Sequence, residues 1–175
     1  MCKSAEKLII ILLFLPATCF GYGVGNVVSG VHSPQELSNW LSTELHYQAE
    51  IPDSWQSAEE TLRLGKGDCE DFAILSSAVL DGLKIPNQLL IIKFKNLKAS
   101  HAICVFKENE LCAFMSNEKM IPTHATLVKD AIEEIYPDWE AIIFTNTAGE
   151  YLKVLTRNQT NKTIENQLET ALRNK

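Results

Sequence analysis

The chain has 175 residues, of which 46% are hydrophobic and 22% charged, which is typical of one soluble globular domain with a sizeable core. The formal net charge is -6 and the pI is about 5.2, and no stripe of basic residues is present. This balance lacks the electrostatic signature of nucleic-acid-binding proteins, so nucleic acid is not an expected partner.

The first segment predicts export. Lys3 and Lys7 precede an apolar run at residues 8–17, which has the length of a signal-peptide core and is too short to span a bilayer. Small residues follow, so we expect cleavage after Cys19 or Gly21. The residues before this cysteine match a lipoprotein cleavage site poorly, which favours a soluble exported protein, periplasmic or secreted, with no membrane span after cleavage.

The chain therefore divides into three predicted parts. Residues 1–21 form the signal peptide, residues 22–157 form the domain, and residues 158–175 form a polar C-terminal helix or tail. Residues 21–30, where the mature chain starts, are rich in glycine and are expected to be a loose N-terminus.

Two helices are expected next. The first lies within residues 33–48, with Ser33 as its N-cap, a proline at the first helical position and Glu36 completing a capping box. The second lies within residues 53–65, where Ser57 begins another capping box and a glycine provides a natural stop.

A third helix and then strands complete the prediction. Residues 68–86 repeat apolar side chains at helical spacing, after which the period changes to that of strands. Strands are predicted at 88–95, 101–106, 111–115, 140–145 and 151–156, and the second and third of them form a hairpin. This order, helices first and antiparallel strands second, predicts an α+β domain with the third helix packed on the sheet.

The stretch GKGDCEDFA, residues 65–73, places a cysteine among three carboxylates at the start of the third helix. Cys69 lies in the first turn, where unpaired backbone N–H groups favour negative charge and can lower the pKa of a cysteine. Asp68, Glu70 and Asp71 act in the opposite direction. The flanking glycines permit close approach of a substrate carbonyl, and the N–H of Cys69 can donate to an oxyanion. These features indicate a nucleophilic thiol.

A nucleophilic thiol needs a partner base, and His101, at the start of the predicted hairpin, is the best placed of the four histidines. If Phe106 pairs with Glu110, the imidazole faces the end of the next strand. Asn117 then lies diagonally near His101 and can orient it. A one-residue change of register puts Ser116 there instead.

The same register predicts that Cys104 and Cys112 face each other across the hairpin. Export permits oxidation, but disulfides between adjacent strands are geometrically demanding, so the sequence leaves this bond open. The histidines and cysteines lack the spacing of zinc ligands, and no structural zinc site is expected.

Each of these residues also has an ordinary structural interpretation. Taken singly, Cys69 is more typical of a small buried hydrophobic residue, and Asp68 and Asp71 are typical helix caps. His101 is equally compatible with a partly buried, hydrogen-bonded side chain. Composition and spacing alone therefore leave catalysis open.

Residues 53–86, followed by SHAICVF and FMSN, resemble the bacterial transglutaminase-like cysteine proteinases of the papain-like, transglutaminase-like superfamily. The family pattern is a Trp and an acidic helix start, then Gly-Asp-Cys-Glu-Asp opening the central helix. A His on a strand and an Asp on the next strand complete it. The match covers about residues 33–120 and implies a papain-like, transglutaminase-like core.

The resemblance implies roles for individual residues. Cys69 matches the nucleophile and His101 matches the base. The family usually reads Leu-Asp-Asn where this chain has Met115-Ser116-Asn117, so Ser116 stands at the usual Asp position and Asn117 at the following Asn. A neutral third residue can still fix an imidazole tautomer, but it stabilises an imidazolium less well than a carboxylate does. The departure implies a weaker enzyme or a degenerate member.

The resemblance also implies a cofactor and a partner. Periplasmic members of the family cut large surface adhesins and need calcium, which acidic residues beside the nucleophile hold. By this resemblance Ca2+ would bind at Asp68, Glu70 and Asp71, whose charges a cation would neutralise. The alternative is that Asp68 and Asp71 cap the helix and no metal binds.

The sequence thus predicts an exported cysteine hydrolase that cleaves amide bonds in a protein substrate, for which the resemblance suggests a cell-surface adhesin. Cys69 attacks the amide, His101 carries the proton, and Asn117 or Ser116 orients His101. Trp55 either shapes the substrate groove or belongs to the core. One alternative is transglutaminase or deamidase chemistry on the same site, because an acyl-enzyme can pass to an amine or to water. Another is a non-catalytic binding module that retains the fold.

Overall fold

The computed structural model describes residues 23–49, 54–95, 100–158 and residue 170. The predicted signal peptide and nearly all of the predicted C-terminal helix or tail lie outside these residues, so the structure does not test them. Within the described part of the chain, no helix is both long and apolar enough to cross a membrane.

The described residues form helices and strands in the order that the sequence predicts, with additions. The elements are α1 (Val24–Gly30), α2 (Pro34–Glu44), β1 (His46–Tyr47), α3 (Ala58–Leu64), β2 (Lys66–Gly67), α4 (Cys69–Gly82), β3 (Asn87–Phe94), β4 (Ser100–Glu108), β5 (Leu111–Ser116), β6 (Lys119–Pro122), α5 (Val128–Ile135), β7 (Trp139–Thr145) and β8 (Tyr151–Thr156).

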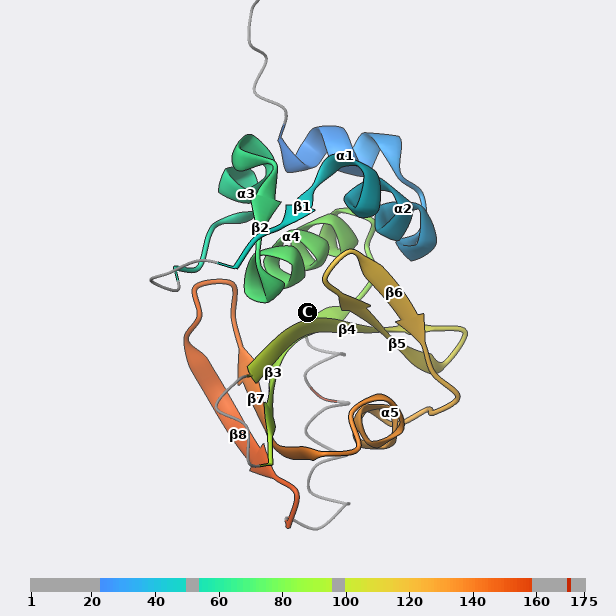
Figure 1. Cartoon of the computed structure of the whole chain (residues 1–175). Coiled ribbons are helices and arrows are strands. Elements are labelled where there is room, and N and C mark those ends of the chain that lie inside the picture. Colours follow the sequence, from blue (N-terminus) through green and yellow to red (C-terminus); the bar gives the residue numbers. More distant parts are fainter. Residues whose placement is uncertain (1–22, 50–53, 96–99, 159–169, 171–175) are drawn as a thin grey trace, which may run out of the picture.

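The main sheet has six strands in the order β6-β5-β4-β3-β7-β8, and every neighbouring pair is antiparallel. Helices α1 to α4 lie on one side of the sheet and α5 lies on the other (Figure 1). A separate parallel pairing joins β1 to β2. The α+β class and the packing of α4 on the sheet are confirmed.

The predicted N-cap serines are confirmed, whereas the Glu36 carboxylate, expected to complete the capping box at Ser33, accepts the N–H of His32 at 2.8 Å. The Ser33 hydroxyl accepts the backbone N–H of Glu36 at 3.2 Å, and the Ser57 hydroxyl accepts that of Glu60 at 3.2 Å. Gly65 ends α3 in the left-handed region, with φ 67°, which side chains other than glycine adopt at a cost. The local signals of these two helices therefore decide where they begin.

The prediction of a loose N-terminus at residues 21–30 is wrong, because Val24–Gly30 is helix α1. Its Val27 is buried in the core beside Val31, and these valines recur at helical spacing. The carboxylate of Glu59 in α3 accepts the N–H of Val24 at 3.1 Å. Burial of the valines and this contact from another helix stabilise a segment whose glycines alone disfavour helix.

Two hydrophobic clusters lie on opposite faces of the sheet. The first packs α1, α2 and α4 against the sheet and includes Leu37, Phe72 and Cys104. The second packs α5 against the sheet and includes Phe114 and Trp139. Successive residues of β4 alternate between the two clusters, as a strand buried on both faces requires.

The predicted register of the β4–β5 hairpin is wrong. Asn109 and Glu110 both have positive φ, 51° and 68°, and form a two-residue turn that makes Glu108 pair with Leu111. Cys104 therefore pairs with Met115 and not with Cys112, which pairs with Lys107.

The two cysteines consequently do not face each other. Cys104 belongs to the cluster that contains α4, and Cys112 belongs to the cluster that contains α5. Both side chains are fully buried on opposite faces of the sheet, and neither belongs to a disulfide among the described residues. This arrangement excludes a disulfide between them without rebuilding the hairpin.

Candidate active site

A buried carboxylate fixes the start of α4. Asp71 is completely buried, and its two oxygens accept the N–H of Gln56 at 2.8 Å and the N–H of Asp68 at 3.1 Å. Gly67 lies directly against it, since a Cβ there would come within 2.5 Å of the Asp71 Cβ. Asp71 thus joins the loop before α3 to the first turn of α4, where Cys69 lies.

The thiol of Cys69 is half-buried and donates to the carboxylate of Glu70, with 3.1 Å between Sγ and Oε2. Burial raises the pKa of this thiol most, the Ala102 backbone N–H lowers it, and the Glu70 and Asp68 carboxylates raise it, which together bring it to about 12. In this arrangement the thiol is protonated at neutral pH. The contact with Ala102 places the sulfur beside the residue that follows His101.

His101 lies on β4 and makes its polar contact with Ser116. Its Nε2 atom is 2.8 Å from the Ser116 hydroxyl, and the Tyr136 hydroxyl donates to the same Ser116 oxygen at 3.1 Å. The rings of His101 and Tyr136 are 5.9 Å apart between centroids. Burial lowers the pKa of His101, so its imidazole is neutral at pH 7.

Of the two candidates for the third position, the structure brings Ser116 to the imidazole. Asn117 follows in the turn between β5 and β6, with φ 51°, and among the described residues its buried Oδ1 atom has no hydrogen-bond partner. The difference follows from the corrected register, which shifts the end of β5 relative to His101.

A cleft opens beside the thiol. It has a volume of about 110 Å³ and is lined by Trp55, Cys69, Glu70, Ile91, Lys93, Ser100, Ala102 and Tyr151. Trp55 therefore contributes to the groove as well as packing on the core, and Gly149 in the β7–β8 turn lies against its ring. A larger cavity of about 350 Å³ lies at the other end of α4, beside Asp81 and Pro86.

The predicted metal ligands fall into two environments. Atoms of Asp68, Cys69 and Glu70 lie within 4.8 Å of one another, and among the described residues the buried Oδ1 atom of Asp68 has no hydrogen-bond partner. Asp71 instead holds backbone N–H groups. Asp68 and Glu70 offer the oxygen atoms that calcium prefers, whereas a thiol suits softer metals.

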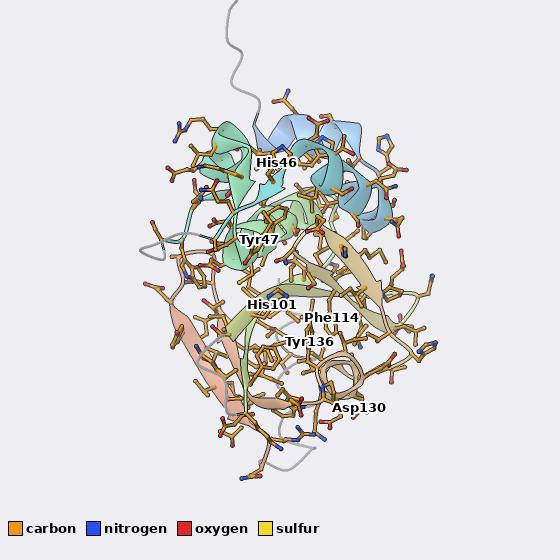
Figure 2. All side chains as sticks on the ribbon, in the orientation of Figure 1. His46, Tyr47, His101, Phe114, Asp130 and Tyr136 are labelled. Carbon is orange, nitrogen blue, oxygen red and sulfur yellow. The ribbon has the colours of Figure 1, made fainter. Side chains whose placement is uncertain are left out.

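Two tyrosines near the site were not found from the sequence. Tyr47 on β1 is 54% exposed, and burial together with the negative charges at Cys69, Asp68 and Glu70 raises its pKa. In the view of Figure 2, Tyr47 lies on the α4 side of His101 and Tyr136 on the α5 side. No local motif marks either tyrosine, because each reaches the site through tertiary packing.

Comparison with known proteins places this geometry in context. A family model described as a transglutaminase-like domain matches residues 29–134. Among solved structures, Legionella pneumophila LapG is similar over 86% of this chain and 84% of its own, with 17% identity and a TM-score of 0.51. Its EGTA-treated form gives 15% identity and a TM-score of 0.50 over 86% and 85% of the two chains. Its calcium-bound form gives 13% identity and a TM-score of 0.49 over 86% of this chain and 96% of its own. Among curated proteins, no sequence matches significantly.

Proposed function

The chain belongs to the family of transglutaminase-like domains, as the motif around Cys69 predicted, and on this premise we propose that it is an exported cysteine hydrolase acting on a protein. The observation that carries the proposal is the position of the thiol. Cys69 opens α4, lines the cleft and lies beside the backbone N–H of Ala102, which follows His101 in the chain.

In the proposed reaction the Cys69 sulfur attacks the carbonyl carbon of a substrate amide while His101 accepts the thiol proton. The C–N bond then breaks, His101 gives the proton to the leaving amine, and a thioester remains. Water attacks this thioester, releases the carboxylic acid and returns the hydrogen to sulfur. The N–H groups at the start of α4 are available to stabilise the oxyanion in both halves.

The substrate of this proposal is an extended segment of a protein, for which a cell-surface adhesin is a candidate. The aromatic side chains of Trp55 and Tyr151 flank the cleft, and Lys93 adds one positive charge near Glu70. Aromatic walls bind apolar side chains and leave the backbone amide above the thiol.

Calcium is part of the proposal. Asp68 and Glu70 would hold the ion, and its charge would offset the carboxylates that keep the thiol protonated. The unpartnered, buried Oδ1 atom of Asp68 supports this assignment, because such an oxygen gains a partner when a cation binds.

A non-catalytic binding module is the second candidate, and two observations favour it. The third position holds the neutral Ser116 in place of a carboxylate, and the pKa of the Cys69 thiol is raised to about 12. A protein that only binds would keep this thiol unreactive even with calcium.

Labelling of new N-termini on intact cell-surface proteins tests the proposal. Purified protein with calcium should create new N-termini, and Cys69→Ala should create none. Cys104→Ala, which alters a fully buried thiol of the same domain, serves as the control and should retain cleavage if the variant folds. Incorporation of a labelled amine would instead indicate transglutaminase chemistry, and side-chain carboxylates in place of amides would indicate deamidation. Absence of all three would favour the binding module.

A further inference from the structure

A chain of side chains connects α5 to the imidazole through β5. The hydroxyl of Tyr136, the residue after α5, donates to the Ser116 hydroxyl at 3.1 Å, and Ser116 lies 2.8 Å from the His101 Nε2 atom. The Tyr136 ring packs at a tilt near His101, Phe94 and Phe114, so its position is well defined. Tyr136 lies just beyond the stretch that the family model matches.

A serine alone is a poor orienting group for a histidine. A carboxylate only accepts hydrogen bonds, so a carboxylate next to Nε2 requires that this nitrogen carry the hydrogen. A hydroxyl both donates and accepts and also rotates, so it is compatible with either tautomer of the imidazole. The tautomer matters because a base that takes the thiol proton on Nδ1 must carry its own hydrogen on Nε2.

The Tyr136 hydroxyl restricts this freedom. Because it donates to Ser116, it occupies one lone pair of the serine oxygen and holds that oxygen in place. A second lone pair of that oxygen is left to accept from His101, whose Nε2 atom lies 2.8 Å away, and which of the two groups donates depends on the imidazole tautomer. Among the described contacts, Tyr136 is the residue that links this serine to a second, rigid element.

We infer that Tyr136 is a positioning residue, which holds Ser116 so that its oxygen accepts the Nε2–H of His101 and leaves Nδ1 to take the thiol proton. The inference rests on the proposed function and names the group that replaces the missing carboxylate. The pair Ser116–Tyr136 is neutral, so it fixes the tautomer without adding charge beside the base.

Nitrogen-15 NMR of protein labelled at histidine tests the tautomer directly and needs no substrate. At a pH where the imidazole is neutral, wild-type His101 should show a protonated Nε2 and an unprotonated Nδ1. Tyr136→Phe keeps the ring and removes the hydroxyl, so both nitrogens should move toward the averaged shifts of mixed tautomers. The exposed His32 and His124 are internal references and should not change. Unchanged His101 shifts in Tyr136→Phe would overturn the inference.

A double-mutant cycle separates positioning from general packing. The rate of Cys69 alkylation by iodoacetamide should fall about fivefold in Tyr136→Phe, the factor that corresponds to loss of one neutral hydrogen bond. In a Ser116→Ala background the same change should alter the rate by less than about twofold, because the hydroxyl then has no serine to hold. A fivefold loss in both backgrounds would show that Tyr136 acts through packing and would refute the inference.

Two further variants sharpen the result. In Ser116→Asp the carboxylate fixes the tautomer alone, so Tyr136→Phe should have little effect in that background. Tyr151→Phe removes another tyrosine hydroxyl near the cleft and should leave the His101 shifts unchanged. If the NMR result holds but no protein is cleaved, the proposed function fails and the positioning role stands. If the wild type cleaves protein but Tyr136→Phe leaves the tautomer of His101 unchanged, the positioning role fails and the proposed function stands.

Discussion

Replacement of Glu70 by glutamine should activate the thiol when no calcium is present. The Glu70 carboxylate accepts the thiol hydrogen at 3.1 Å and is itself 6% exposed, so it disfavours the thiolate by charge and by hydrogen bonding. Glutamine has nearly the same shape and no charge. The substitution therefore tests the electrostatic effect with little change in packing.

The size of the effect follows from Coulomb's law. Unit charges separated by about 4 Å interact by ~1 kcal/mol in water and ~4 kcal/mol at an effective dielectric constant of about 20. Because the thiol is half-buried, we take a middle value of ~2 kcal/mol, which lowers its pKa by about 1.5. A thiolate of lower pKa is also a weaker nucleophile, so the alkylation rate should rise by roughly sixfold.

The assay is the alkylation rate of Cys69 at pH 8 in a chelator, followed by mass spectrometry of the intact protein. Glu108→Gln, an exposed glutamate at the far end of β4, is the matched control and should react like the wild type. Calcium should accelerate the wild type and have little effect on Glu70→Gln, which lacks a proposed ligand. A Glu70→Gln variant that folds, reacts no faster than the wild type in chelator and keeps its calcium response would refute this reasoning.

Four further outcomes are expected. Removal of calcium by a chelator should lower both the melting temperature and the cleavage rate. Calcium at about 100 times its Kd should restore ~2.7 kcal/mol of stability. Calorimetry that detects no change would argue against a bound calcium ion. Burial holds the pKa of His101 below its usual 6.5. The alkylation rate should therefore rise with pH, as the imidazole loses its proton, in an acid limb centred below pH 6.5. Ser116→Asp should move that limb to higher pH, because a carboxylate stabilises the imidazolium. Finally, Cys69, Cys104 and Cys112 should all react with a thiol reagent in denatured, unreduced protein, and loss of two thiols would contradict the hairpin register.

The local parts of this fold and site could be predicted from the sequence. Ser33, Ser57 and Gly65 carry their signals within a few residues, so the starts of two helices and the end of α3 follow from capping chemistry. The position of Cys69 at the start of α4 follows for the same reason. In each case the deciding interactions lie within one turn of helix.

The parts that depend on distant residues could not be predicted. The hairpin register depends on a turn with positive φ at Asn109 and Glu110, a dipeptide without the glycine that usually marks such turns. Helix α1 forms because its valines pack against α4, although its glycines have a low helix propensity. Tyr136 reaches His101 because α5 packs against the sheet, and the sequence pattern predicts no element at α5.

The two clusters on either face of the sheet have a consequence for how this site can evolve and fail. Cys69 packs against the cluster beneath α1, α2 and α4, while the ring next to His101 belongs to the cluster around α5. The two reactive groups therefore depend on separate cores, and β4 is the strand they share. Mutations that loosen one core should displace one group and leave the other in place. Mutations that accumulate in either core can therefore abolish the thiol chemistry while the fold persists. This is one physical route from an enzyme to a binding domain.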